Sequence, residues 1–146
     1  MVLQDYCSGF SIGAILNEDV NWTCEMTVGF LVHQLLLCLE HLHSLGIAHK
    51  HIDLEHLICN TINPNFKDSE FKLLGVEMPC IATEGDMFLA PEVFLGELGP
   101  KQDVFALGIL VYKVVSNNYP IEEQETLSSY RKSQIDELSS IVSNGG

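Results

Sequence analysis

Residues 47–58 read Ile47-Ala48-His49-Lys50-His51-Ile52-Asp53-Leu54-Glu55-His56-Leu57-Ile58, and no other stretch of the chain is as informative about the fold. It follows a segment whose apolar residues recur at three- and four-residue steps from about Thr27, which is the pattern of an amphipathic helix. Gly46 stands where that helix is expected to end, because glycine adopts the left-handed conformation at little cost. The histidine-rich stretch is therefore expected to be a loop that leads from this helix into the apolar run 57–59.

The pattern on either side of this loop predicts a mainly helical α+β fold. Glycine, proline and asparagine separate the apolar segments, and Asn63-Pro64 marks a turn. The helix at 103–115 is apolar nearly all round, which is typical of a helix buried in the middle of a domain. The other expected elements are a strand at 2–6, a short helix at 11–17, a hairpin formed by the runs 57–59 and 71–74, and a serine-rich tail at 122–146 with roughly helical periodicity.

The composition excludes several classes of partner. Of the 146 residues, 47% are hydrophobic, and 20 acidic against 7 basic residues give a formal net charge of −13. So acidic a chain is not expected to bind nucleic acid or an anionic membrane surface. No run approaches the roughly 20 apolar residues of a membrane-spanning helix. The apolar excess predicts surface that meets another protein.

The cysteines predict an intracellular protein. Five of them are scattered along the chain, an odd number without the spacing of a disulfide framework. We expect reduced, mostly packed thiols and a cytoplasmic location, since the first residues lack the basic and apolar regions of a signal peptide. The cysteines are Cys7, Cys24, Cys38, Cys59 and Cys80.

The stretch 47–58 resembles the catalytic loop of protein kinases, whose pattern is His-Arg-Asp, four residues and Asn. His49 matches the histidine, and Lys50 replaces the arginine. His51 stands at the aspartate that accepts the substrate proton, and His56 at the asparagine that holds magnesium. A neutral imidazole can take a proton, but it is a poor ligand for magnesium, which prefers hard oxygen donors.

Further motifs in the same order extend the resemblance to residues 2–115. Ala90-Pro91-Glu92 matches the tripeptide that closes the activation segment, here residues 75–92. The sequence from Asp103 to Gly108 resembles the start of the central helix. The resemblance implies that residues 2–9 form the hinge strand and its linker, and that the chain is a partial kinase large (carboxy-terminal) lobe over residues 1–121, followed by the tail 122–146.

The resemblance also implies structural roles for several matched residues. His49 would pack in the hydrophobic spine, and the Asp103 carboxylate would accept hydrogen bonds from the loop backbone. Glu92 would lack its usual arginine partner, so it is expected to be solvated or paired with another chain. His41 and His43 are expected to be solvated or to cap the end of the long helix.

Three departures from the family predict that the chain is not an enzyme. Gly75 stands where the family has the magnesium-binding aspartate of Asp-Phe-Gly, and His51 and His56 replace the other two groups. The sequence also lacks a Gly-x-Gly-x-x-Gly loop. We therefore expect no cofactor, and weak, magnesium-independent ATP binding only if a complementary amino-terminal lobe is supplied. His56-Leu57-Ile58 and Gly75 are similar to the STRAD type of inactive kinase.

The sequence thus predicts a truncated pseudokinase that serves in signalling as a protein-interaction or allosteric scaffold. Its expected partner is a protein, either another kinase or a second copy of the chain. The alternative is a fragment or splice form of a longer serine/threonine protein kinase-like protein, whose amino-terminal lobe supplies ATP binding.

A metal site is not expected from the sequence. His49, His51, His56 and Cys59 are ligand types that zinc prefers, yet their spacing matches no standard zinc motif. Asp53 lies two residues beyond the position of the catalytic aspartate, so it is not expected to replace that group without a shift in register.

Overall fold

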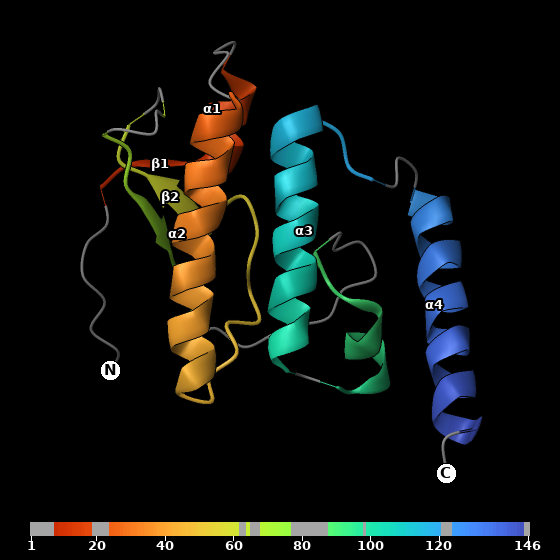
Figure 1. Ribbon diagram of the computed structural model, residues 1–146. Coiled ribbons are helices and arrows are strands. Elements are labelled where there is room, and N and C mark those ends of the chain that lie inside the picture. Colours follow the sequence, from red (N-terminus) through yellow and green to blue (C-terminus); the bar gives the residue numbers. More distant parts are fainter. Residues whose placement is uncertain are drawn as a thin grey trace.

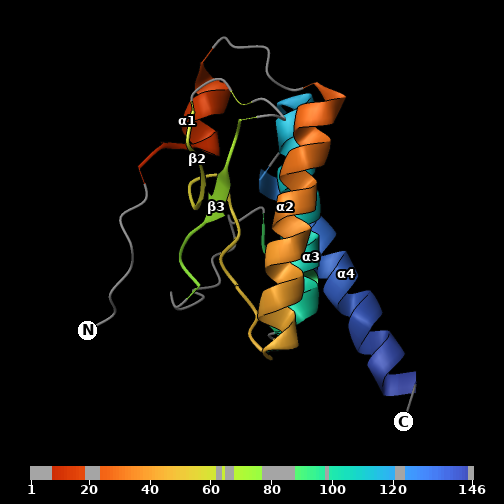
Figure 2. The ribbon, with the colours of Figure 1, turned by 60° about the vertical axis from the view of Figure 1, so that its left-hand side comes forward.

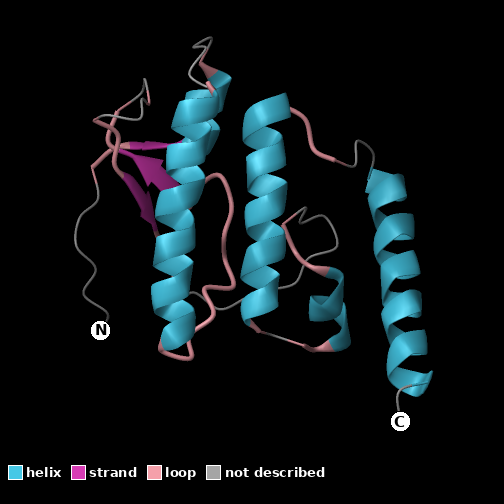
Figure 3. Ribbon diagram, in the orientation of Figure 1, coloured by secondary structure: helices cyan, strands magenta, loops and turns pink. Residues whose placement is uncertain are grey.

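Helices dominate the structure, and one small antiparallel sheet lies beside them (Figures 1 and 3). The structure is a computed structural model, and it describes residues 8–18, 24–61, 64, 68–76, 88–97, 99–120 and 124–144. The mainly helical α+β class is as predicted. In chain order the elements are β1 (Phe10–Ser11), α1 (Ile12–Asn17), α2 (Glu25–Ser44), β2 (Leu57–Cys59), β3 (Phe71–Leu73), the 3₁₀ helix η1 (Pro91–Leu95), α3 (Pro100–Ser116) and α4 (Gln124–Asn144).

The predicted long helix is α2, and its end explains how the histidine-rich loop begins. Gly46 has a φ of +74°, in the left-handed region that the sequence analysis assigned to it. Its N–H donates to the carbonyl of His43, and the N–H of Ile47 donates to the carbonyl of Leu42. These two bonds satisfy carbonyls at the helix end and turn the chain sharply back into the loop.

The predicted hairpin is confirmed as β2 and β3, which pair antiparallel with Leu57 opposite Leu73 and Cys59 opposite Phe71. A third strand, β1, extends the sheet in the order β1-β2-β3. This two-residue strand was not predicted, since two residues are too few to show alternation. The expected strand at 2–6 lies outside the described residues.

The core lies between α2, α3 and the hairpin (Figure 1). Helices α2 and α3 run side by side in opposite directions, with the sheet beside α2. Their facing side chains recur at helical steps, so each helix buries one stripe. The most deeply buried apolar residues of the core are Ile12, Ile15, Leu31, Leu57, Leu110 and Val114.

The expectation that the helix at 103–115 is buried in the middle of the domain holds for one face only. Helix α3 buries one face, which includes Ala106, Leu107 and Leu110. On its other faces Val104 and Val115 are more than half exposed. The described part of the chain covers only one side of this helix, although its sequence is apolar on several.

The carboxy-terminal tail forms helix α4, as its periodicity predicted. Figure 2 shows α4 crossing behind α2 and α3 and extending away from them at its far end. It contacts η1, the 3₁₀ helix that contains the Ala-Pro-Glu proline. A second small core cluster of Leu89, Ala90 and Val93 packs against Phe105 and ties η1 to α3.

Candidate functional site

The carboxylate of Asp103 fixes the backbone of the histidine-rich loop. This residue lies in the first turn of α3 and is 1% exposed. Its Oδ2 atom accepts from the N–H of His49 at 2.8 Å, and its Oδ1 atom accepts from the N–H of Lys50 at 2.9 Å. Lys50 has a φ of +68°, a conformation that residues with a Cβ adopt rarely. The two charge-assisted bonds hold this turn in place.

His43 is the third partner of Asp103, and the sequence analysis missed it. Its Nε2 atom lies 2.7 Å from Asp103 Oδ2, so this imidazole neither caps the end of α2 nor is fully solvated. The contact joins the last turn of α2 to the first turn of α3 and, through Asp103, to the loop. No local pattern could have indicated it, because the two residues are 60 positions apart.

His49 packs in the interior, the position that the resemblance implied. The residue is fully buried, and its Nδ1 atom accepts a hydrogen bond of 3.1 Å from the N–H of His51. Burial lowers the pKa of the His49 imidazole below its ordinary value, because the charged form loses its hydration. The Asp103 carboxylate opposes part of this shift.

The depressed pKa of His49 gives a prediction for stability against pH. The unfolded chain binds this proton at a higher pH than the folded protein does, so acid favours unfolding. We expect the free energy of unfolding to decrease as the pH falls below about 6.5. Urea denaturation at a series of pH values should show this decrease. The variant His49→Gln should lose that part of the decrease, whereas His33→Ala, at an exposed position of α2, should retain it.

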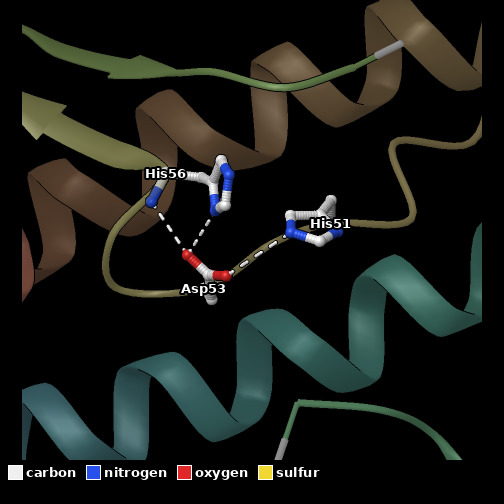
Figure 4. Close-up of side chains that lie close together, drawn as sticks. All are labelled: His51, Asp53 and His56. Atoms are coloured by element: carbon white, nitrogen blue, oxygen red, sulfur yellow. Dashed lines mark hydrogen bonds and ion pairs between the residues drawn. The ribbon is translucent and has the colours of Figure 1, made fainter. Parts of the chain in front are cut away.

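A second group of side chains gathers in the same loop, between His49 and β2. Figure 4 shows the carboxylate of Asp53 between the imidazoles of His51 and His56. Asp53 Oδ1 lies 2.7 Å from His56 Nδ1, and Asp53 Oδ2 lies 3.9 Å from His51 Nε2. The rings of His51 and His56 meet edge to face with their centroids 4.3 Å apart. All three side chains are partly exposed, at 22–27%.

Backbone hydrogen bonds fix the Asp53 carboxylate. Its Oδ1 atom accepts from the N–H of Glu55 at 2.9 Å and from the N–H of His56 at 2.8 Å. Two further contacts tie this turn to the first helix: the carbonyl of Leu54 accepts from the N–H of Gly13, and the Glu55 carboxylate accepts from Ser11 Oγ. Asp53 was not a predicted site residue, because it lies outside the family's aspartate position. Asp53 closes the turn through its bonds to the N–H groups of Glu55 and His56, which form only in this conformation of the loop.

The arrangement can accept a proton and can offer mixed nitrogen and oxygen ligands. Figure 4 shows one ring nitrogen of His51 facing Asp53 and the other directed away from it. An imidazole beside a carboxylate is the usual arrangement for general base chemistry. The same three side chains form a group whose ligand atoms lie within 4.8 Å of one another. Neither His49 nor Cys59 belongs to this group.

The other motif residues do not belong to the cluster of His51, Asp53 and His56. Ala90 is fully buried, and Pro91 and Glu92 begin η1. Gly75 follows β3 with a φ of +86°. Gly108 is exposed on α3, where an added Cβ would meet open space. Residues 77–87 of the expected activation segment lie outside the described part of the chain.

Two of the described cysteines do not fit the expectation of packed thiols. Cys24 and Cys38 are exposed, whereas Cys59 is buried in the hairpin. Burial raises the pKa of the Cys59 thiol, so that group stays protonated more readily than a free cysteine.

Among the described residues, no helix is long and apolar enough to span a membrane.

The sequence of the chain matches a known family and named relatives. The model of the protein kinase domain matches residues 1–144. The striated muscle preferentially expressed protein kinase of Danio rerio is 30% identical over 86% of this chain and 4% of its own length. The serine/threonine-protein kinase dkf-1 of Caenorhabditis elegans is 25% identical over 87% of this chain and 19% of its own length. The CBL-interacting serine/threonine-protein kinase 2 of Arabidopsis thaliana is 27% identical over 88% of this chain and 29% of its own length. The chain thus spans less than a third of each of these relatives.

These matches correct the prediction that the chain is not an enzyme. That prediction was based on the residue types at His51, His56 and Gly75 and on the lack of a Gly-x-Gly-x-x-Gly loop, whereas the relatives carry the names of protein kinases. Substitutions at three positions do not separate the chain from this group, because the match extends over nearly its whole length. The chain belongs to the protein kinase domain family.

Proposed function

We propose that this chain is the large lobe of a serine/threonine protein kinase domain in the cytoplasm. It would transfer the terminal phosphoryl group of ATP to a hydroxyl group of a protein, with an amino-terminal lobe supplying the ATP-binding residues. The observation that carries the proposal is the Asp103 carboxylate, which holds the backbone of His49 and Lys50 in a fixed turn. In the sequence motif, His51 follows that turn and corresponds to the aspartate with which the family accepts the substrate proton.

The chemistry requires His51 to act as the proton acceptor. The substrate hydroxyl oxygen forms a bond to the terminal phosphorus as the bond from that phosphorus to the leaving ADP oxygen breaks. The hydroxyl proton passes to the His51 ring nitrogen that faces away from Asp53 (Figure 4). The imidazolium that forms lies beside the Asp53 carboxylate, which stabilises it.

The family's magnesium ligands do not fit this loop. His56 Nδ1 is engaged by Asp53 at 2.7 Å, and an imidazole is a poor magnesium ligand. Gly75 has no side chain to offer. We therefore propose that nucleotide binding by this domain is independent of magnesium.

The test is phosphoryl transfer by the full-length polypeptide that carries this chain. The protein is incubated with radiolabelled ATP and casein, with magnesium or with a chelator, and the product is hydrolysed to identify the labelled amino acid. We expect label on serine or threonine, and an ATP-induced rise in the unfolding temperature that is the same with magnesium and with chelator. A preparation that incorporates no label under either condition contradicts the proposal.

A protein-interaction role is the second candidate, and exposed apolar side chains favour it. On α2, Met26 and Leu37 are 60% and 52% exposed, and on α3 Val104 and Val115 are 58% and 59% exposed. Apolar side chains repeated on two neighbouring helices favour association with another protein, either a kinase or a second copy of this chain. Light scattering distinguishes the outcomes for self-association: a dimer supports it, and a monomer at all concentrations contradicts it.

A further inference from the structure

We propose that His51, Asp53 and His56 form a binding site for a divalent transition-metal ion, with Zn²⁺ as the best-fitting ion. The ligand atoms are His51 Nε2, Asp53 Oδ2 and His56 Nδ1, and they come from six consecutive residues of one loop (Figure 4). The site does not depend on bound nucleotide. Of these ligands, the sequence suggested only His51 and His56 as zinc-binding residue types. The Asp53 carboxylate that completes the set matches neither a zinc motif nor a family position.

The distances suit a metal ion after small side-chain rotations. A tetrahedral Zn²⁺ bonded at about 2.1 Å to each ligand separates neighbouring ligand atoms by about 3.4 Å. His51 Nε2 now lies 3.9 Å from Asp53 Oδ2, and His56 Nδ1 lies 2.7 Å from Asp53 Oδ1. The first pair must approach by about half an ångström. The second distance is a hydrogen bond to Oδ1, which is not the ligand atom, so metal binding requires the His56 ring to turn from Oδ1 toward Oδ2. Both changes need only rotation of partly exposed imidazoles.

The Asp53 carboxylate is oriented as a metal ligand requires. Its Oδ1 atom is held by the backbone N–H groups of Glu55 and His56, which leaves Oδ2 on the side of His51. Hydrogen bonds that orient a ligating carboxylate in this way strengthen metal binding. A role in closing the turn explains the contacts of Oδ1. It does not explain why a second imidazole faces Oδ2.

The ligand types select the ion. Two imidazoles and one carboxylate match the sites of zinc and of neighbouring transition metals, whereas magnesium and calcium require mostly oxygen ligands. The side chains are 22–27% exposed, so an ion has an entry path and a free coordination position for water. The chain's net charge of −13 attracts cations to its surface.

Bound metal excludes the proposed role of His51 as proton acceptor. A neutral imidazole has one lone pair, and a metal ion on Nε2 uses it while the other nitrogen carries a proton. Zn²⁺ should therefore inhibit phosphoryl transfer by the domain. This consequence depends on the proposed function, but metal binding itself does not, so calorimetry tests the site even if the protein transfers no phosphate.

The test is a titration of the tag-free chain with ZnCl₂ by isothermal calorimetry, without nucleotide. We expect one ion per chain. His51→Ala and Asp53→Asn should each weaken binding by at least about tenfold, the lower bound for loss of groups that hold a metal. His33→Ala, which removes an exposed imidazole of α2, and Glu40→Gln, which neutralises an exposed carboxylate of α2, should leave the dissociation constant unchanged.

Two further measurements keep the result interpretable. Zn²⁺ should raise the unfolding temperature of the wild type and both controls but not of His51→Ala. The ion pair that this variant loses is long, 3.9 Å from His51 Nε2 to Asp53 Oδ2, so the variant should still fold. Co²⁺ should bind with a visible spectrum that lacks thiolate charge transfer, since no cysteine contributes. Absence of a stoichiometric site, equal affinity in wild type and His51→Ala, or a thiolate band would each overturn the proposal.

Discussion

Replacing Asp103 by alanine is expected to lower the free energy of unfolding by about 3–5 kcal/mol, the cost of removing one member of a buried charged network. The carboxylate is 1% exposed and accepts three hydrogen bonds, from His43 and from the backbone of His49 and Lys50. Alanine leaves two backbone N–H groups without an acceptor, at about 1–3 kcal/mol each. It also leaves His43 without its partner and removes the support for the positive φ of Lys50.

Urea denaturation of the purified chain measures this effect. Glu40→Ala is the matched control, because Glu40 is an exposed carboxylate on α2, and its loss should change the free energy of unfolding by less than about 0.5 kcal/mol. Asp103→Asn should fall between the two, since the amide keeps one acceptor oxygen and loses the charge. A loss below about 1 kcal/mol in Asp103→Ala would mean that the loop is held by other contacts.

The sequence was informative about the elements that have strong local patterns. Helix α2 shows apolar residues at helical steps, and Gly46 supplies the left-handed residue that ends it, so both were predictable. The hairpin and α3 were predictable for similar reasons. Strand β1 and helix η1 were not, because β1 has two residues and η1 five, too short to display a period.

Some residues of the candidate site could be predicted from the sequence, and others could not. The family resemblance pointed to His49, His51 and Asp103, because each occupies a motif position. It could not point to His43 or Asp53. His43 reaches Asp103 only because α2 and α3 pack side by side, and Asp53 turns toward two imidazoles only because the loop closes on its own backbone. Only the His43 contact depends on tertiary structure. The Asp53 turn is local, but many aspartates in loops can form such a turn, so the residue pattern did not single it out.

The prediction that the chain is not an enzyme was wrong. It treated three residue types and the lack of a Gly-x-Gly-x-x-Gly loop as sufficient evidence against catalysis, whereas the chain matches proteins named as kinases. In the structure His51 is not an isolated imidazole, since the Asp53 carboxylate lies 3.9 Å away and the Asp103 carboxylate fixes the turn before it. The match of residues 1–144 to the protein kinase domain made an enzymatic function the stronger interpretation.

The variant His51→Ala tests the proton-acceptor role. Loss of a general base lowers the rate of a reaction by about 10²–10⁴-fold, so we expect kcat for phosphoryl transfer to fall by that factor with KM little changed. The fold should persist, because the backbone N–H of His51 still donates to His49 Nδ1 in the variant. His33→Ala provides the matched control on α2, with unchanged kcat and KM expected.

The most direct test of the whole account is therefore the rate of phosphoryl transfer from ATP to casein by the full-length polypeptide, measured for wild type, His51→Ala and His33→Ala. The account predicts label on serine or threonine with wild type and His33→Ala, and a rate at least about 100-fold lower with His51→Ala. Equal rates in all three proteins would contradict the role of His51, and no transfer by the wild type would contradict the proposed kinase function itself.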